Sequence, residues 1–207
     1  MTASLAPLDA IAESIRMIDT LERHRADLPA VESMLHAHRQ IHHDLTLCHD
    51  ASEAAVNAWR AALARRWDYE VAGRRLYKQV FRQIADTLGE LSPQIQMLSR
   101  GGAEANSSPS ELLKDLRRIQ ACLMIEASQL PFAAERLRQI EEICSALELA
   151  ISAAQDCEHR RRNAVLDNRM ARESFRRICE ETFGKLSAYY GSRFADEFPE
   201  FAEITAS

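Results

Sequence analysis

Apolar residues recur every three or four positions along most of this chain, which is the spacing of amphipathic helices. The first such pattern runs from Pro7 to His24, and proline suits the first turn of a helix. Leu28-Pro29 then ends the pattern, because a residue that precedes proline disfavours the α conformation. A much longer pattern follows and continues to about Gly89. The chain therefore begins with a predicted short helix and a predicted long one.

One heptad register runs through the whole of the long pattern. Such a register keeps one face of a helix toward a partner helix. Asp50 and Ser52 are residue types that cap helices, so one unbroken helix and two helices that meet near residue 50 both fit. The register consists of Leu35, His38, Ile41, Leu45, Cys48, Ser52, Ala55, Trp59, Ala62, Arg66, Tyr69, Gly73, Leu76 and Val80.

The second half of the chain repeats this order at an offset of 102 residues, without a gap. Leu28-Pro29 matches Leu130-Pro131, and a second register follows the second of these corners. We interpret the match as a tandem duplication. Such a repeat matters for the fold, because each copy is expected to form the same helical unit. Further identical pairs are Pro7/Pro109, Arg16/Arg118, Leu21/Leu123, Leu35/Leu137, Ile41/Ile143, Leu45/Leu147, Leu47/Leu149, Ala51/Ala153, Phe81/Phe183 and Gly89/Gly191.

The predicted organisation has four parts. Residues 5–91 form the first helical repeat and residues 110–191 the second. Residues 92–109 are rich in Ser, Gly and Pro and are predicted to be a flexible linker, and residues 192–207 form an acidic-aromatic tail. The predicted fold is all-α: an elongated antiparallel helical bundle built from two tandem short-helix/long-helix repeats with coiled-coil-like seams. A linker of this length spans at most about 60 Å, whereas an unbroken 62-residue helix is about 93 Å long, so the second repeat is expected to turn back.

Composition supports a helical protein in the cytoplasm. Six Gly and six Pro in 207 residues are few, which disfavours β-sandwiches, barrels and disordered chains. No run of 18 apolar residues predicts a transmembrane segment, and the N-terminus lacks the pattern of a secretory signal. Five cysteines without a CxxC pair fit reduced thiols.

Positive charge gathers in two segments of an acidic chain. The net charge is −5, but residues 59–82 hold seven Lys or Arg against two Asp or Glu, and residues 160–184 hold seven against four. If the two long helices are antiparallel and staggered, these two segments lie at the same height along the bundle. They then predict an arginine-rich belt that binds an anionic partner, or else a solvated face paired with nearby acids. Nucleic acid is disfavoured by the acidic total. The belt consists of Arg60, Arg65, Arg66, Arg74, Arg75, Arg162, Arg176 and Arg177.

Aromatic residues gather in the tail. Phe194, Phe198 and Phe201 alternate there with four acidic residues. Two interpretations stand side by side. The aromatic side chains pack onto the end of the helical bundle, or they form a docking peptide for another chain.

Five of the seven histidines lie in residues 36–49. His38 and His42 are four residues apart, which is the spacing at which two imidazoles share one metal ion, and His49 continues that helix face. The HExxH pattern is absent, however, because Arg39 follows His38. A duplicated metal site is also excluded, because the second repeat has other residues at the matching positions, namely Ile140, Cys144 and Ile151.

No motif of a known reaction is present. The sequence contains no GxSxG, no P-loop and no GxGxxG, so we expect no enzyme activity and no cofactor. The function that we expect is non-catalytic: a cytoplasmic helical protein that mediates protein–protein interaction, with a homodimer as one arrangement. The alternatives are a divalent-metal-binding protein that uses the histidines, and a binder of an anionic surface that uses the arginine belt.

Overall fold

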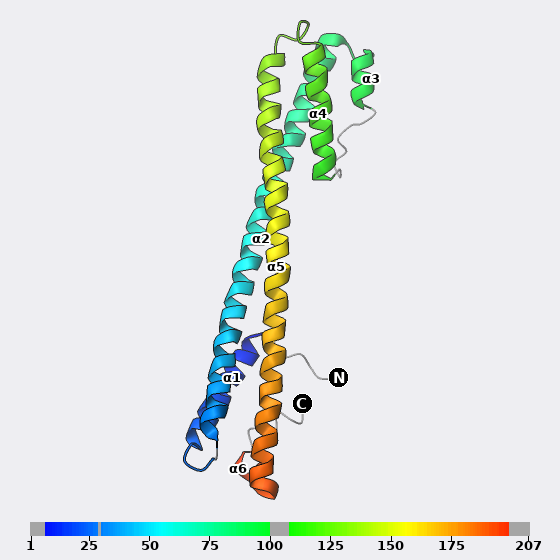
Figure 1. The fold of residues 1–207 in the computed structure, drawn as a ribbon. Helices are drawn as coiled ribbons and strands as arrows, with labels where there is room; N and C mark the ends of the chain where they lie inside the picture. Colours follow the sequence, from blue (N-terminus) through cyan, green and yellow to red (C-terminus); the bar gives the residue numbers. More distant parts are fainter. Residues whose placement is uncertain (1–6, 29, 100–107, 199–207) are drawn as a thin grey trace. The chain divides into compact units, whose positions relative to one another are not determined.

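The computed structural model describes residues 7–28, 30–99 and 108–198 (Figure 1). Every helix or strand assigned in these ranges is a helix, which confirms the all-α prediction. None of the helices described is long and apolar enough to cross a membrane. The helices are α1 (Pro7–Arg23), α2 (Val31–Leu88), α3 (Pro93–Ser99), α4 (Pro109–Ile125), α5 (Ala133–Tyr190) and α6 (Phe194–Glu197), with a 3₁₀ turn, η1 (Gly191–Arg193), before α6.

The described residues form two compact units, and each unit takes residues from both predicted repeats. Unit 1 comprises the described residues of 1–56 and 160–207, and unit 2 comprises those of 57–159. In each unit, a short helix and part of its own long helix pack against part of the other long helix. A helical hairpin leaves an apolar face uncovered, so a third helix completes each core.

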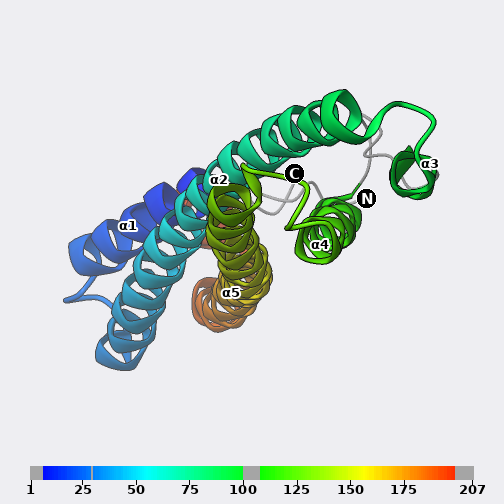
Figure 2. The same ribbon diagram turned by 90° about the horizontal axis from the view of Figure 1, so that it is seen from above.

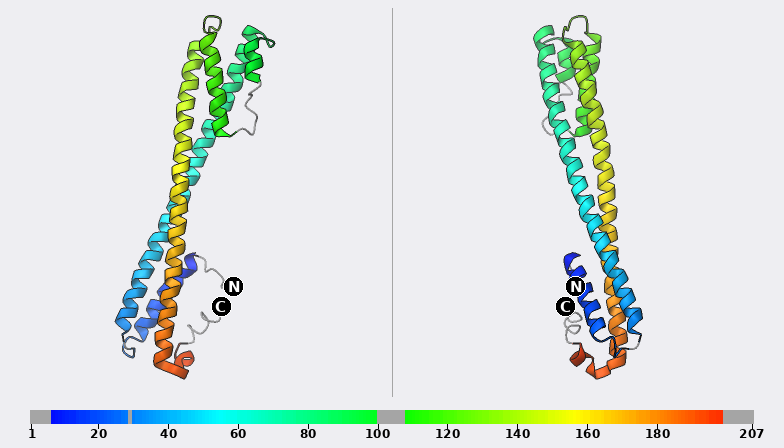
Figure 3. Two further views of the ribbon diagram at one scale, coloured as in Figure 1. Left: turned by 45° about the vertical axis from the view of Figure 1, so that its right-hand side comes forward. Right: turned by 90° about the vertical axis from the view of Figure 1, so that its left-hand side faces the viewer.

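Unit 1 packs α1 against the start of α2 and the end of α5 (Figure 3). His38 of α2 lies beside Thr182 of α5, and Cys48 of α2 lies near Asp167 of α5. Residue numbers thus rise along one helix while they fall along the other, so α2 and α5 are antiparallel in this unit. The fully buried side chains of this core include Met17, Leu21, Leu35 and Leu45.

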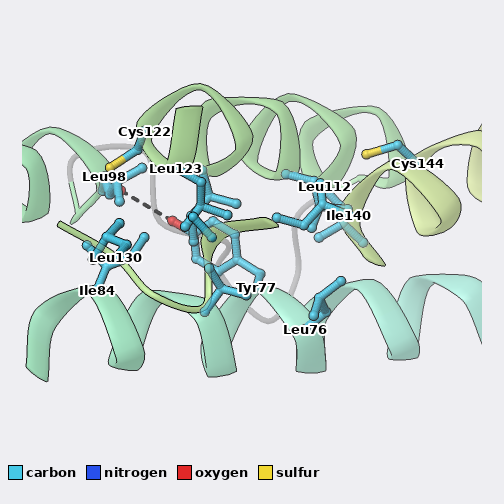
Figure 4. Close-up of a cluster of buried hydrophobic side chains, with 14 of the residues drawn as sticks. Leu76, Tyr77, Ile84, Leu98, Leu112, Cys122, Leu123, Leu130, Ile140 and Cys144 are labelled. Carbon is cyan, nitrogen blue, oxygen red and sulfur yellow. Dashed lines mark hydrogen bonds between the residues drawn. The ribbon is translucent and has the colours of Figure 1, made fainter. Parts of the chain in front are cut away.

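Unit 2 packs α3 and α4 against the end of α2 and the start of α5 (Figure 4). Arg136 of α5 donates a 2.9 Å hydrogen bond to the Gln83 side chain of α2, and further along Gly73 of α2 lies beside Ile143 of α5. Residue numbers rise along one helix while they fall along the other, so the long helices are antiparallel here as well as in unit 1. Tyr77 points from α2 into the core, and its hydroxyl donates to the Leu98 carbonyl. Buried side chains of this core include Val80, Ile84, Leu112, Leu116, Ile119, Leu123, Ile140 and Leu147.

Helix α3 lies inside the segment predicted to be a linker. Its side chains Ile95 and Leu98 are buried in the core of unit 2, and α3 lies beside α4 (Figure 2). The remainder of that segment, residues 100–107, is outside the described residues. Helix α4 then begins with a capping box, in which the Ser108 and Glu111 side chains each accept a hydrogen bond from the backbone N–H of the other.

The residues of the predicted register on α2 form the covered face of that helix. All fourteen, from Leu35 to Val80, are buried or half-buried, and the helix continues unbroken through residue 50. The second register, on α5, is likewise buried or half-buried throughout. It consists of Ile140, Ile143, Leu147, Ala150, Ala154, Cys157, Ala164, Ala171, Phe175 and Ile178. The elongated arrangement of the repeats and their coiled-coil seams stay predictions.

The helix boundaries of the two halves match at the predicted offset. Helices α1 and α4 both have 17 residues and begin at Pro7 and Pro109, which are 102 positions apart. Helices α2 and α5 both have 58 residues, and Val31 and Ala133 are again 102 positions apart.

The turns match at the same offset. Each long helix is followed by a glycine with positive φ, at 88° for Gly89 and 57° for Gly191. Glycine adopts this conformation at little cost and commonly ends helices in this way. The corner hydrogen bond from the Met34 N–H to the Ala30 carbonyl also has a counterpart, from the Arg136 N–H to the Phe132 carbonyl.

Candidate functional site

The arginines of the predicted belt are divided between the units. Arg60, Arg65, Arg66, Arg74 and Arg75 belong to unit 2, whereas Arg162, Arg176 and Arg177 belong to unit 1. The three in unit 1 are exposed, as are Arg60, Arg65 and Arg75 in unit 2.

Two of the unit 2 arginines are held by a buried carboxylate. Glu70 is 4% exposed, and its carboxylate lies 3.0 Å from Nε of Arg66 and 3.6 Å from Arg74. All three residues are on α2, four positions apart, so the two arginines flank the carboxylate on one face. A buried charge needs such partners, so Arg66 and Arg74 serve the packing of this unit rather than presenting free charge to a ligand.

The face of α2 that adjoins Arg74 in unit 2 is both apolar and basic. Trp67 is 61% exposed and Val71 is 41% exposed. Arg60 lies seven residues before Trp67, and Lys78 lies seven residues after Val71, so all four share one helix face. Both basic side chains are exposed. We call these four residues the Trp67 face. A large exposed aromatic side chain beside cations is typical of a surface that binds another protein.

An apolar groove lies on another side of unit 2, between α2 and α5. Its volume is about 450 Å³. Ala146 of α5 lines the groove, and Leu149 lies three residues further along, on the same side of that helix. The Leu149 side chain is 72% exposed. The sequence prediction did not include this groove. The only indication of the groove in the sequence is that Leu149 has an identical counterpart, Leu47, at the repeat offset. The Leu47 side chain is also exposed, at 54%. The groove is lined by Tyr69, Ala72, Leu76, Gln139, Glu142, Ile143 and Ala146.

His38 is a core residue of unit 1. Its side chain is fully buried, its Nε2 lies 2.9 Å from the Thr182 hydroxyl, and its ring meets Phe175 edge-on. Its Nδ1 has no hydrogen-bond partner among the described residues. Burial lowers the pKa of His38 to about 4, so the ring is neutral at pH 7.

The other two histidines of the metal hypothesis have different surroundings. The Ser14 hydroxyl donates to the Ile11 carbonyl and lies 2.8 Å from Nδ1 of His42, so that ring nitrogen is the donor of this pair. His49 is half-buried. Within the described ranges, no group of three or more His, Cys, Asp or Glu side chains is placed to hold a metal ion. The metal hypothesis stays a prediction.

The tail aromatics pack against unit 1. Phe198 is 2% exposed, and its ring centroid lies 4.7 Å from that of His24 and 5.0 Å from that of Tyr190. Phe194 is half-buried beside it. A partner chain reaches Phe198 only if the tail leaves this position. Phe201 lies outside the described residues.

The cysteines do not offer an activated nucleophile. All five are free thiols, and Cys122, Cys144 and Cys179 are buried. Burial raises the pKa of Cys144 to about 11 and that of Cys179 to about 12. A reactive cysteine has the opposite shift, because the thiolate is the nucleophile.

This burial predicts an order of thiol reactivity. At pH 7.5, a disulfide reagent is expected to modify the half-buried Cys157 first and Cys48 next. Cys144 and Cys179 should react only as the protein unfolds, because both are buried and because a pKa raised from 9 to about 11 leaves Cys144 about 100-fold less thiolate, with still less for Cys179. Peptide mapping by mass spectrometry measures the order. Rapid modification of Cys144 or Cys179 in the folded protein would contradict this packing.

No protein-family model, curated protein or solved structure matches this chain.

Proposed function

We propose that this chain is a non-catalytic cytoplasmic protein that binds other proteins, as an adaptor or a structural component of a larger assembly. The observation that carries the proposal is the Trp67 face. The tryptophan side chain is 61% exposed beside Val71 on a regular helix, and neither side chain belongs to the hydrophobic core of unit 2. Exposed apolar side chains that adjoin one another on a helix mark sites of protein interaction.

Charge indicates the chemistry of the partner. Arg60 and Lys78 flank the apolar pair, so an amphipathic segment with acidic residues at its edges complements this face. Such a segment places an apolar side chain against Trp67 and its carboxylates against the two cations. The five free thiols fit the reducing conditions of the cytoplasm, which is where we place this interaction.

The finer fold prediction, two tandem repeats, supports a structural protein of this kind. Helix lengths, the two positive-φ glycines and the corner hydrogen bonds all match at the offset of 102 residues. We infer that the chain arose by duplication of one short-helix/long-helix element. Side chains that differ at matched positions then give each unit its own surface.

Comparison of two variants tests the proposed function. The full-length protein, immobilised, is exposed to extract of the native host at low and high salt. We expect it to retain an acidic protein, and Trp67→Ala should weaken that binding by about 30-fold, as for a central interface tryptophan. The matched control is Met124→Ala, since Met124 is 65% exposed on α4 and outside the Trp67 face. Equal capture by both variants, or binding to anionic lipid vesicles that Trp67→Ala leaves unchanged, would count against the proposal.

A further inference from the structure

The groove between α2 and α5 in unit 2 has edges of opposite charge. Its α2 edge carries the exposed Arg65 and Arg75, which lie four residues before Tyr69 and three after Ala72, with Asp68 between them. Its α5 edge carries Glu142, which lines the groove, and Glu135, which lies four residues before Gln139, with the exposed Arg138 between them.

The apolar part of this surface is open. Helix α4 covers the other side of the two long helices. Its Leu112 and Leu116 side chains lie against Gly73 of α2, which also lies beside Ile143 of α5. The groove side keeps Ala72 and Ala146 half-buried and Leu149 72% exposed. We call this side the open face of unit 2. Two adjacent helices with an apolar groove between them are half of a four-helix bundle.

The register of the two helices places the charges level with one another. Gly73 lies opposite Ile143, and Gln83 lies opposite Arg136. Residue numbers therefore rise along α2 as they fall along α5. By this register, Arg75 lies at the same height along the helix pair as Glu142, to within about two residues. A two-fold axis parallel to the helices places α2 of one copy beside α5 of the other, and these two helices are antiparallel. Rotation about this axis keeps every residue at its own height along the axis. Such an axis brings Arg75 to Glu142 of the second copy, and Glu142 to its Arg75.

We infer that the open face of unit 2 binds the open face of unit 2 in a second copy of this chain. The two apolar grooves then form one four-helix core, with Leu149 of each copy buried in it. Glu142 pairs with Arg138 at 2.8 Å in the single chain, with both side chains more than 60% exposed. An exposed pair of this kind contributes little, so exchanging it for Arg75 of the second copy costs little.

Unit 1 shows why the second copy pairs through unit 2. The face equivalent to the open face carries Leu47 where unit 2 carries Leu149. The charges on its two edges, however, do not complement each other. At the positions of Arg65 and Arg75, one edge carries one charge of each sign, Asp167 and Arg177. At the positions of Glu135 and Glu142, the other edge carries the uncharged Ser33 and Gln40. Charge complementarity is therefore specific to unit 2.

Sedimentation equilibrium of the full-length chain over a wide concentration range tests this inference. We expect a monomer–dimer equilibrium that Arg75→Glu and Glu142→Arg each weaken by at least about tenfold. An equimolar mixture of these two variants should recover the wild-type dimer, because each like-charge contact then becomes an opposite-charge contact. Leu149→Glu should also weaken the dimer, and Met124→Glu on α4 should leave it unchanged.

Three results would overturn the inference: a monomer at all concentrations, a dimer that neither charge reversal weakens, or a mixture that fails to restore it. Circular dichroism of each variant should give the wild-type helical content, because all of the substituted side chains are exposed. Leu149 is on α5 and outside the Trp67 face, so a monomeric Leu149→Glu protein that still binds a partner through Trp67 would leave the proposed function standing.

Discussion

Unit 1 is expected to lose about 3 kcal/mol of stability as the pH falls from 7 to 4, because His38 is buried in its neutral form. In the unfolded chain the ring takes up a proton below its ordinary pKa of 6.5, whereas the buried ring, with a pKa of about 4, does not. The unfolded state therefore binds more protons between these values. The contribution is complete above pH 6.5, falls as the pH falls toward 4, and is lost below it.

The second repeat supplies the control for this prediction. The positions equivalent to His38 and Thr182 are Ile140 and Val80, both fully buried in unit 2. The double variant His38→Ile/Thr182→Val places the same apolar pair in unit 1, and its unfolding free energy should fall less between pH 7 and pH 4 than that of the wild type. Denaturant unfolding at the two pH values measures the difference. Equal losses in both proteins would contradict a neutral buried His38.

Gly73→Phe is expected to destabilise unit 2 by at least about 3 kcal/mol, because it adds a ring to a filled core. A Cβ at Gly73 would already lie 3.3 Å from a methyl group of Leu112 and 3.4 Å from methyl groups of Leu116 and Ile143. Unit 1 carries Phe175 at the equivalent position, and it is 2% exposed.

Unit 1 accommodates that ring because the short helix differs as well. The residues equivalent to Leu112 and Leu116 are Ala10 and Ser14, both buried. Adding Leu112→Ala and Leu116→Ser to Gly73→Phe should therefore restore more than half of the lost stability. The matched control is Gly184→Phe on α5, where an added Cβ meets nothing within 4 Å, and it should cost little. Denaturant unfolding measures all three proteins, and a single Gly73→Phe variant of wild-type stability would contradict this packing.

Periodicity predicts the main helices closely because each of them buries a long apolar stripe. The first helix, predicted over 7–24, spans Pro7–Arg23, and the long helix of the second repeat, predicted within 110–191, ends at Tyr190. Helix α3 was missed because seven residues are too few to display a helical period, and Ser, Gly and Pro dominate its surroundings. Ile95 and Leu98 make it a helix by packing into unit 2, which is a tertiary effect.

The candidate sites were harder to predict because residue type does not reveal burial. The spacing of Arg66, Glu70 and Arg74 is visible in the sequence, but the burial of the carboxylate between them is not. His38 belongs both to the heptad register and to the histidine cluster, and only its full burial beside Thr182 decides which role it takes. The Trp67 face is defined by exposure, which likewise depends on where the other helices end.

A photoreactive amino acid at position 71 of the full-length protein tests the proposed function most directly, because it leaves Trp67 in place. Irradiation in the native host is expected to give one discrete adduct with an acidic protein, because the exposed side chain at this position lies beside Trp67 on the face that binds the partner. The same amino acid at position 124 should give no such adduct, since Met124 lies on α4, outside that face. The absence of an adduct at position 71, or the same adducts at both positions, would contradict the account.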